Sequence, residues 1–352
     1  MKTYNVAVVG VGAVGIEMLR TLKNRNFPVG ELKVLARSER DISVDGKPYH
    51  VSTVTPESFK GIDIALFAGT EGEKGAAVTF APQAVKNGAV VIDNGADFRM
   101  RPDVPLVIPE VNPEDANPVR DFFLSRHREG ISNGAKKHKG IIANPNCSTI
   151  QMVVALSPIY KLSKITRVIV STYQAASGAG RSAADELVQQ LKDITSGKQA
   201  AAPKVLPQRI AFNVFPHIGS FAEENYTSEE WKMVKETHKI MHDDNIKISA
   251  TCARVPVITG HSEAVYIETE KPIKVEKIRE VLEKAKGIKV LDDPLKNIYP
   301  NAFESEGKYD VFVGRIRRDP FVKNGYWLWV VSDNLLKGAA LNAVQIAELL
   351  IA

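Results

Sequence analysis

The sequence predicts an α/β protein with two domains, and three observations support this. The first half alternates short apolar runs with segments of helical periodicity, the pattern of a parallel sheet with helices on both faces. In the second half, long alternating strands follow one another with few helices between them, which indicates an α+β domain on a mixed, largely antiparallel sheet. With 352 residues, the chain is long enough for two separate cores.

The first domain is expected to cover residues 1–146. Residues 4–9 are apolar enough for a buried strand, glycines follow at once, and VGIEMLRTLKN then has helical periodicity. The next expected strands are ELKVLA, DIALFAG, AVVIDNG and PLVIPEV, with GAAVTFAPQAVKNG as a helix among them. This order is typical of a doubly wound sheet. The polar, turn-rich residues 114–139 are expected to form a surface loop.

The second domain is expected to cover residues 147–333. Its strands are predicted at ITRVIVSTYQ, IKISATCARVPV, SEAVYIETE, KYDVFVGRIRR and GYWLWVVSD. Helices at GRSAADELVQQLKDI and SEEWKMVKETHKIM are expected to cover one face of that sheet. The final segment, 334–352, has a continuous apolar stripe and is expected to be a helix that returns to complete the first domain.

Composition and charge narrow the range of partners. The chain is 44% hydrophobic and 25% charged, as in ordinary soluble proteins, and no apolar run is long enough to span a membrane. A net charge of +5 could indicate nucleic acid, but the basic residues are dispersed among acids, so we expect a small anionic substrate instead. Two cysteines and the lack of an export signal predict a cytoplasmic location without a structural disulfide.

A glycine-rich turn, GVGAVG at residues 10–15, follows the first strand and opens the first helix. Glycines in this context let the backbone approach a pyrophosphate, whose charge the helix N-terminus stabilises, as in Rossmann-type domains. The alternative is a turn that serves only close packing. We therefore predict a dinucleotide site with these candidate residues: Gly10, Gly12, Ala13, Val14 and Gly15.

The segment LARSERD, at the end of the second strand, bears on which dinucleotide binds. An acid that would hold the ribose hydroxyl of NAD is missing from the strand end, and Arg37, Ser38 and Arg40 offer donors to a 2′-phosphate instead. The nearby Glu39 argues the other way, and all four side chains could be ordinary surface groups. The pattern favours NADP.

One cysteine stands at an expected helix start. In NPNCSTIQMVVAL, Cys147 would lie in the first turn, where the helix dipole favours a thiolate. Such a thiolate is a good nucleophile toward a carbonyl carbon. Considered alone, however, a cysteine is more often a small buried residue, and Cys252, inside a predicted strand, is expected to be one.

A base for that thiol has a candidate in CARVPVITGHSEAVYIE. His261 precedes one predicted strand, and Arg254 lies near the end of the one before it. If the two strands formed a hairpin, imidazole and guanidinium would meet at one end of the sheet. A histidine satisfied in the core, or at the surface, is the competing interpretation.

Several motifs together resemble the aspartate-β-semialdehyde dehydrogenase family over nearly the whole chain. They are NPNCSTIQ, STYQAASGAG, EEWKMVKET, RVPVITGHSE, DNGADFRMRPDVPLVIPEVN and DNLLKGAALNAVQ. The N-acetyl-glutamyl-phosphate reductases share the chemical logic but carry a different cysteine motif. FAGTEGEKGAA differs from the family's usual stretch after the third strand, so its cofactor contacts stay open.

The resemblance implies an NADP-dependent, reversible reaction in the lysine, threonine and methionine branch of synthesis. Aspartyl phosphate would be reduced to the semialdehyde, with release of phosphate, through a thioester on Cys147. His261 would be the acid/base, and Gln174 would orient the substrate or intermediate.

The resemblance also implies binding residues. Arg254 would clamp the α-carboxylate, Glu229 would meet the ammonium group, and Lys232 and Arg99 would bind phosphate, with Arg101 as a bystander. Glu229 and Lys232 lie on one face of a helix for which Thr227 and Glu230 predict a capping box; a surface ion pair is the alternative. Further cofactor contacts are implied for Ser177, Gly178, Asn334 and Asn342.

Rival functions remain at this stage. A reductase of another acyl phosphate would not need Glu229, because an acetylated amine carries no charge. A dinucleotide-binding protein with an inert Cys147, or a cysteine hydrolase, would differ in its use of the thiol and of NADP. By analogy with the family, we expect a homodimer or homotetramer built through the second domain's sheet, with no metal site and no nucleic-acid or membrane partner.

Overall fold

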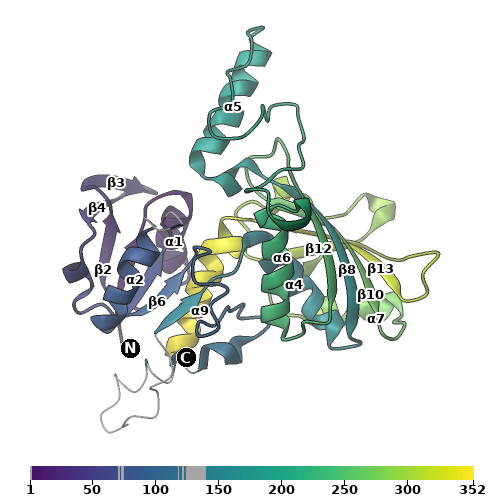
Figure 1. The fold of residues 1–352 in the computed structure, drawn as a ribbon, viewed down its shortest axis with the longest axis horizontal. Coiled ribbons are helices and arrows are strands. Elements are labelled where there is room, and N and C mark those ends of the chain that lie inside the picture. The colour runs from purple at the N-terminus through teal and green to yellow at the C-terminus, as the bar shows by residue number, and fades with distance from the viewer. Residues whose placement is uncertain (1, 70–71, 73–74, 118, 121–122, 124–139) are drawn as a thin grey trace. The chain divides into compact units, whose positions relative to one another are not determined.

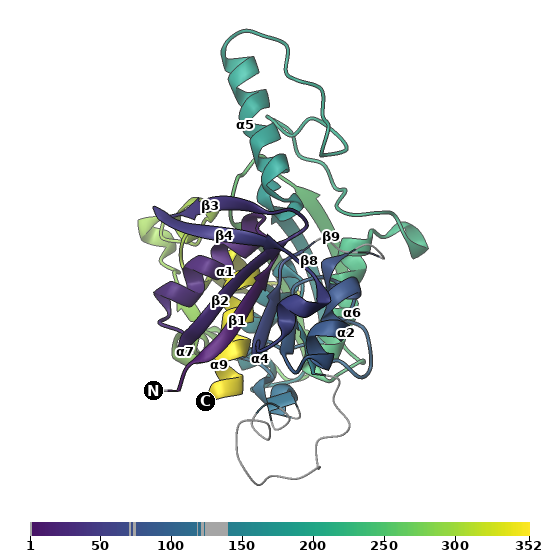
Figure 2. The same cartoon turned by 90° about the vertical axis from the view of Figure 1, so that its left-hand side faces the viewer.

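The computed structural model describes residues 2–69, 72, 75–117, 119–120, 123 and 140–352. The chain divides into two compact units, drawn in Figures 1 and 2. Unit 1 comprises Met1–Asn146 and Ala339–Ala352, and unit 2 comprises Cys147–Gly338. Most of the long loop expected at 114–139 lies outside the described residues, as does part of FAGTEGEKGAA. In the part of the chain that is described, no helix is long and apolar enough to cross a membrane.

The sheet of unit 1 has the strand order β3-β4-β2-β1-β5-β6-β7. All its strand pairs are parallel except β3 with β4, so β1 stands where the order of parallel strands reverses. In such sheets, ligands bind beyond the carboxyl ends of the strands at this reversal. The strands are β1 (Tyr4–Val9), β2 (Val29–Ala36), β3 (Arg40–Val44), β4 (Lys47–Thr53), β5 (Ile64–Phe67), β6 (Val90–Asp93) and β7 (Ile141–Ala143).

Helices pack on this sheet and close its core. These are α1 (Ala13–Asn24), α2 (Ala76–Lys86) and α9 (Leu341–Ile351), and α9 packs against α1. The helix expected over 334–352 is shorter than predicted, because a π-helical turn at Leu336–Ala340 precedes α9. The return segment within unit 1 accordingly begins at Ala339.

Two local predictions for unit 1 differ from the structure. PLVIPEV forms no strand beyond a single bridge from Leu106 to Ala143; Pro105 and Pro109 flank that bridge and lack the amide donors that a ladder needs. The β3–β4 hairpin was not predicted. Its turn is Asp45-Gly46, with φ of 50° and 76°, so an Asp-Gly signal marked this hairpin in the sequence.

The sheet of unit 2 has the strand order β11-β12-β13-β10-β8-β9. The inner pairs are antiparallel, and the outermost pairs, β11 with β12 and β8 with β9, are parallel. This confirms the predicted mixed sheet. The strands are β8 (Ile165–Gln174), β9 (Lys247–Arg254), β10 (His261–Thr269), β11 (Ile288–Val290), β12 (Val311–Arg318) and β13 (Gly325–Ser332).

The helices that pack on this sheet are α4 (Cys147–Tyr160), α6 (Ser228–Met241) and α7 (Val275–Lys284). A short helix, α8 (Ala302–Ser305), contacts β13. The expectation that the segment at Arg181–Thr195 covers the sheet is wrong: this helix, α5, stands clear of it in both views. The apolar face of α5 instead packs on the returning chain around Leu206, Ile210 and Phe215, which gives it a small core of its own.

Candidate active site

The candidate site in unit 2 is built at one edge of the sheet. β8 and β9 run parallel and end together, with Gln174 beside Arg254. Since β10 is antiparallel to β8, it begins at this same edge, at His261. The hairpin predicted for Arg254 and His261 is wrong, because β8 lies between their strands. The chain crosses over through residues 255–260, which hydrogen-bond to Ala176 and Ser177 beyond the end of β8.

Cys147 is the first residue of α4, as predicted, and its side chain is partly exposed. A backbone turn approaches it closely at Gly338, inside the π-helical turn. A Cβ atom added to Gly338 would lie 2.8 Å from the Cβ of Cys147, so only glycine leaves the thiol undisturbed. Sequence reasoning missed Gly338, although π-helical turns often mark functional sites.

The imidazole of His261 is fully buried, and its hydrogen bonds define its tautomer. The Ala175 amide donates to Nδ1 over 3.0 Å, so the proton of the neutral ring belongs on Nε2. No described residue hydrogen-bonds Nε2. Burial, and then the charge of Arg254, lower the pKa of His261 to about 3, against an opposing effect of Glu229. At neutral pH the ring is therefore an uncharged donor through Nε2–H.

Arg254 is buried and stays cationic, although burial lowers its pKa. Its Nη1 donates to the Ala175 carbonyl over 2.7 Å. The negative charge of Glu229, and that of Cys147 when its thiol is ionised, oppose the effect of burial, so the guanidinium lies within electrostatic range of both groups. A thiolate at the start of α4 would thus have a fixed positive partner.

Gly178 lets the backbone come close to both of these side chains. A Cβ atom added there would lie 2.9 Å from Nη1 of Arg254 and 3.1 Å from Nε2 of His261. The imidazole and the guanidinium therefore flank a single point at the end of β8. Any side chain at this position would press on one of them.

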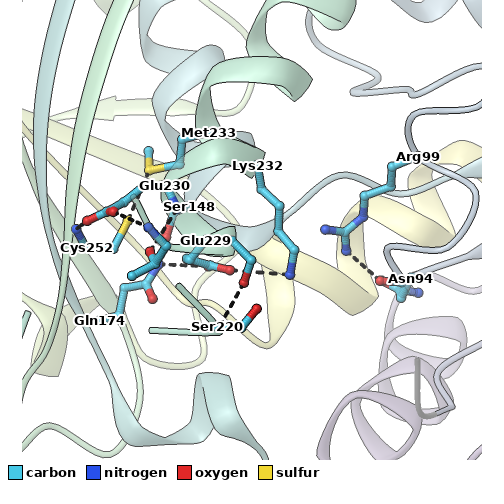
Figure 3. Close-up of polar contacts among 12 residues, drawn as sticks. Asn94, Arg99, Ser148, Gln174, Ser220, Glu229, Glu230, Lys232, Met233 and Cys252 are labelled. Atoms are coloured by element: carbon cyan, nitrogen blue, oxygen red, sulfur yellow. Dashed lines mark hydrogen bonds and ion pairs between the residues drawn. The ribbon is translucent and has the colours of Figure 1, made fainter. Parts of the chain in front are cut away.

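Gln174 connects the start of α4 with α6. Its amide nitrogen donates to Ser148, next to Cys147, and to Oε1 of Glu229 over 3.2 Å, as Figure 3 shows. Lys232 lies 3.5 Å from the other oxygen of Glu229. The side chain of Glu229 is only 9% exposed, so this pair is not the solvated surface pair considered as the alternative.

The predicted capping box at the start of α6 is confirmed. The Glu230 amide donates to the hydroxyl of Thr227, and the Glu230 carboxylate accepts from the Thr227 amide over 2.7 Å. The same carboxylate also accepts from the amide of Cys252, which fixes the first turn of α6 on β9. Cys252 is fully buried, and burial raises the pKa of its thiol, as expected for a core residue.

Two residues predicted to contact the cofactor, Ser177 and Asn334, are both buried and bind each other. The Asn334 amide donates to the hydroxyl of Ser177 over 3.0 Å. Its oxygen accepts from the amide of Gly260, which adopts a φ of 93° directly before His261. Asn334 therefore fixes the backbone at Gly260, directly before the first residue of β10.

The glycine turn of unit 1 joins β1 to α1, with Gly12 as the N-cap. Gly10 has a φ of 101°, and a Cβ there would lie 2.8 Å from the Ala68 carbonyl. A Cβ on Gly15 would strike the carbonyl of Gly10. A Cβ on Gly12, in contrast, would meet no atom of the described residues within 4 Å. Gly10 and Gly15 serve packing, whereas the open side of Gly12, followed by Ala13 and Val14 in α1, fits the close approach of a pyrophosphate.

The segment after β2 is exposed. Ser38 accepts a hydrogen bond from Arg40 over 3.0 Å, and Arg37 beside it is exposed. Glu39 lies 3.4 Å from His50 on β4, and both of these side chains are more than half exposed.

Arg99, also in unit 1, is buried in a network of backbone oxygens. Its Nε donates to the Asn144 carbonyl over 2.9 Å and its Nη2 to the Asn94 carbonyl over 2.6 Å; Figure 3 includes the contact with Asn94. Asn342, on α9, donates to the Asn144 side chain over 2.6 Å. Arg101 is more exposed and pairs with Asp103, as expected of a bystander.

Of the predicted residues, unit 2 thus brings together Cys147, Gln174, Glu229, Lys232, Arg254 and His261. The glycine turn, Arg37, Ser38, Arg99 and Asn342 belong to unit 1.

Two family models match separate parts of the chain. A family model described as "Semialdehyde dehydrogenase, NAD binding domain" matches residues 5–118, and one described as "Semialdehyde dehydrogenase, dimerisation domain" matches residues 156–337. The aspartate-semialdehyde dehydrogenase of Aquifex aeolicus is 54% identical over 355 residues, covering 99% of this chain and 98% of that protein. That of Bacillus subtilis is 48% identical over 360 residues, with 99% and 97% covered.

Solved structures match the whole chain as well. The aspartate semialdehyde dehydrogenase II of Vibrio cholerae complexed with ASA superposes with a TM-score of 0.89 at 44% identity, covering 100% of this chain and 99% of that chain. The aspartate semialdehyde dehydrogenase of Candida albicans with NADP has a TM-score of 0.73 at 25% identity, with 100% and 99% covered. With relatives this similar over nearly its whole length, the chain belongs to the aspartate-semialdehyde dehydrogenase family.

Proposed function

We propose that the chain catalyses the reversible, NADP-dependent reductive dephosphorylation of L-aspartyl 4-phosphate to L-aspartate 4-semialdehyde through a thioester on Cys147. The observation that carries this proposal is the thiol at the first residue of α4, within electrostatic range of the buried guanidinium of Arg254. The product would feed lysine, threonine and methionine synthesis.

In the reductive direction the Cys147 thiolate attacks the acyl carbon of aspartyl phosphate. A carbon–sulfur bond forms, the bond between the acyl carbon and the phosphate oxygen breaks, and phosphate leaves. When NADPH is bound, it supplies the hydride that reduces the thioester carbon. The tetrahedral oxyanion then reforms a carbonyl and expels the Cys147 thiolate, which releases the semialdehyde without net proton transfer.

His261 is proposed to act on the oxyanions of both tetrahedral stages. Because Nδ1 accepts from Ala175, the proton on Nε2 is available as a hydrogen-bond donor. This tautomer supports a donor role more than the role of a base that deprotonates Cys147. The helix N-terminus and Arg254 would instead favour the thiolate. Gln174, tied to Ser148 and Glu229, would orient the substrate beside them.

The remaining charges suit an amino-acid acyl phosphate. Arg254 would bind the α-carboxylate, and Glu229 would bind the ammonium group. Lys232 and Arg99 would bind the phosphate. Glu229 favours aspartyl phosphate over an N-acetylated substrate, because a buried carboxylate pairs with an ammonium group and not with a neutral acetylated amide.

NADP is the proposed cofactor. Bound at the turn of Gly10, Gly12 and Gly15, it would place its pyrophosphate at the N-terminus of α1. Arg37 and Ser38, which are both exposed after β2, would face the 2′-phosphate. The other proposed cofactor contacts are Ser177, Gly178, Asn334 and Asn342. Replacing NADP⁺ with NAD⁺ in the assay below tests the preference directly.

A homodimer or homotetramer in the cytoplasm is part of the proposal. The face of the unit 2 sheet opposite α4 carries paired aromatic rings, Tyr173 with Trp329 and Tyr266 with Trp327. Beside Trp329 lies a hollow of about 380 Å³. Such an aromatic surface suits the second copy that the description "dimerisation domain" implies. Light scattering during size-exclusion chromatography would measure the mass.

The test of the whole proposal follows NADPH absorbance with aspartate semialdehyde, phosphate and NADP⁺ supplied. We expect phosphate-dependent NADPH formation, its loss in Cys147→Ala, and rapid labelling of Cys147 by iodoacetamide. Cys252→Ala is the matched control and should keep turnover, because this thiol is buried in the core. If the purified protein formed no NADPH, or Cys147→Ala kept its turnover, the proposal would be wrong.

A further inference from the structure

A buried carboxyl group lies directly behind the candidate site. Glu263 follows His261 by two residues in β10, so both side chains point to the same face of the sheet. The residue has no exposed surface, and neither carboxyl oxygen has a hydrogen-bond partner among the described residues. Burial raises the pKa of Glu263 well above its usual range, and the amide of Gln151 opposes this effect. Burial therefore favours the uncharged form of this acid.

The side chains around Glu263 connect α4, which carries Cys147, with the two strands that carry His261 and Ser332. Gln151 lies one helical turn after Cys147 in α4 and is fully buried. Its Oε1 accepts a hydrogen bond from Ser332 over 2.7 Å. Ser332 is in turn the direct β13 partner of His261. Gln151 thus contacts the strand next to His261 and interacts electrostatically with Glu263.

The helix that carries Cys147 needs such polar contacts to fix its orientation. Residues 148–157 of α4 are all buried. A helix buried on every side has no single apolar stripe, so hydrophobic packing alone does not select which face meets the sheet. Hydrogen bonds are directional, and a buried polar group that must be satisfied selects one rotation of the helix and one height along its axis.

We propose that Glu263 is a positioning residue which, with Gln151 and Ser332, holds the first turns of α4 in register against β10 and so sets Cys147 against His261. As an uncharged acid, Glu263 offers one donor and one acceptor to the amide of Gln151. The inference rests on the proposed thioester mechanism, since it matters only if the thiol and the imidazole act together. The proposed role of Glu263 needs the hydrogen bonds of its acid group and does not need a negative charge.

Two variants of Glu263 separate these properties. Glu263→Gln keeps a donor and an acceptor in nearly the same shape, and we expect it to retain kcat within about threefold. Glu263→Leu removes both, and we expect kcat to fall roughly 10- to 100-fold, because misplacement by about an ångström costs that much. KM for aspartate semialdehyde, phosphate and NADP⁺ should change little. Tm of Glu263→Leu should fall slightly, because the buried amide of Gln151 loses this partner, whereas Glu263→Gln should keep it.

The combination of lost kcat and kept KM, with kcat retained in Glu263→Gln, is what a merely structural residue would not produce. A fully active Glu263→Leu would overturn the inference, and so would a Glu263→Gln variant as impaired as Glu263→Leu. If Glu263→Leu does not fold by circular dichroism, Gln151→Met takes its place; the same loss of kcat is expected, and normal kcat would overturn the inference.

Failure of the proposed function is distinguishable in the same experiment. A wild-type protein that forms no NADPH from aspartate semialdehyde, phosphate and NADP⁺ refutes the function itself, and this inference with it. An active wild type beside an equally active Glu263→Leu refutes this inference alone. Cys252→Ala, on β9 of the same sheet and outside the network, is the control for a change of similar depth and should keep kcat.

Discussion

The close approach of Gly338 to Cys147 gives a prediction whose magnitude follows from the structure. In Gly338→Ala, the new methyl carbon would lie 2.8 Å from the Cβ of Cys147. Carbon atoms in contact prefer about 3.5–4.0 Å, so one of the two segments must move by roughly 1 Å. Gly338 does not have a positive φ, so alanine strains no backbone angle there, and the contact alone decides the result.

A displacement of about 1 Å at a reacting group typically lowers the rate about 100-fold, which corresponds to about 2.7 kcal/mol in the activation barrier. We expect kcat of NADPH formation to fall by about this factor in Gly338→Ala, and further in Gly338→Val. Overpacking of this kind also costs about 1–3 kcal/mol of stability, which urea unfolding would measure.

The assay pairs steady-state kinetics with the rate of iodoacetamide labelling at Cys147. A moved thiol should keep its ability to be labelled while kcat falls, since alkylation needs no alignment with a bound substrate. If Gly338→Ala turned over like the wild type, the reasoning from the short contact would be refuted.

Three further predictions rest on other parts of the site. Gly12→Ala should leave Tm unchanged, because its methyl group meets no protein atom within 4 Å, yet raise KM for NADP⁺ about tenfold or more; an unchanged KM would contradict a pyrophosphate at this turn. Glu229→Gln should raise KM for aspartate semialdehyde by about 10- to 100-fold, the cost of a lost charged partner, whereas equal KM would show that the ammonium group binds elsewhere. The stability of His261→Gln should be less sensitive to acid than that of the wild type. The pKa of His261 is about 3 in the folded chain and about 6.5 in the unfolded chain, so between these values only the unfolded chain takes up the proton. Wild-type stability therefore falls as the pH drops below about 6.5. Urea unfolding at pH 7 and pH 5 should show an extra wild-type loss of about 2 kcal/mol, and parallel losses in both proteins would contradict a buried neutral imidazole.

The elements predicted correctly share a strong local signal. The first strand, the glycine turn and α1 follow from an apolar run, three spaced glycines and helical periodicity. The start of α6 follows from Thr227 and Glu230, whose side chains satisfy backbone groups within three residues of each other.

The errors have physical reasons of a different kind. α5 has the amphipathic pattern of a helix that covers a sheet, but its apolar face is buried by the chain around Leu206 and Phe215. Periodicity states that a helix has an apolar face and does not name what covers it. The wrong hairpin between Arg254 and His261 has the same origin, because strand order depends on non-local pairing with β8.

The sequence by itself determined the fold class, the helix start at Cys147, the glycine turn and the residue types that suit an amino-acid acyl phosphate, because each depends on neighbours along the chain. Only the tertiary structure decided the tautomer of His261, the approach of Gly338 to the thiol and the burial of Glu263 behind it. These features arise where segments at least 86 residues apart pack together, and the distances between their atoms are set by the packing of the whole unit.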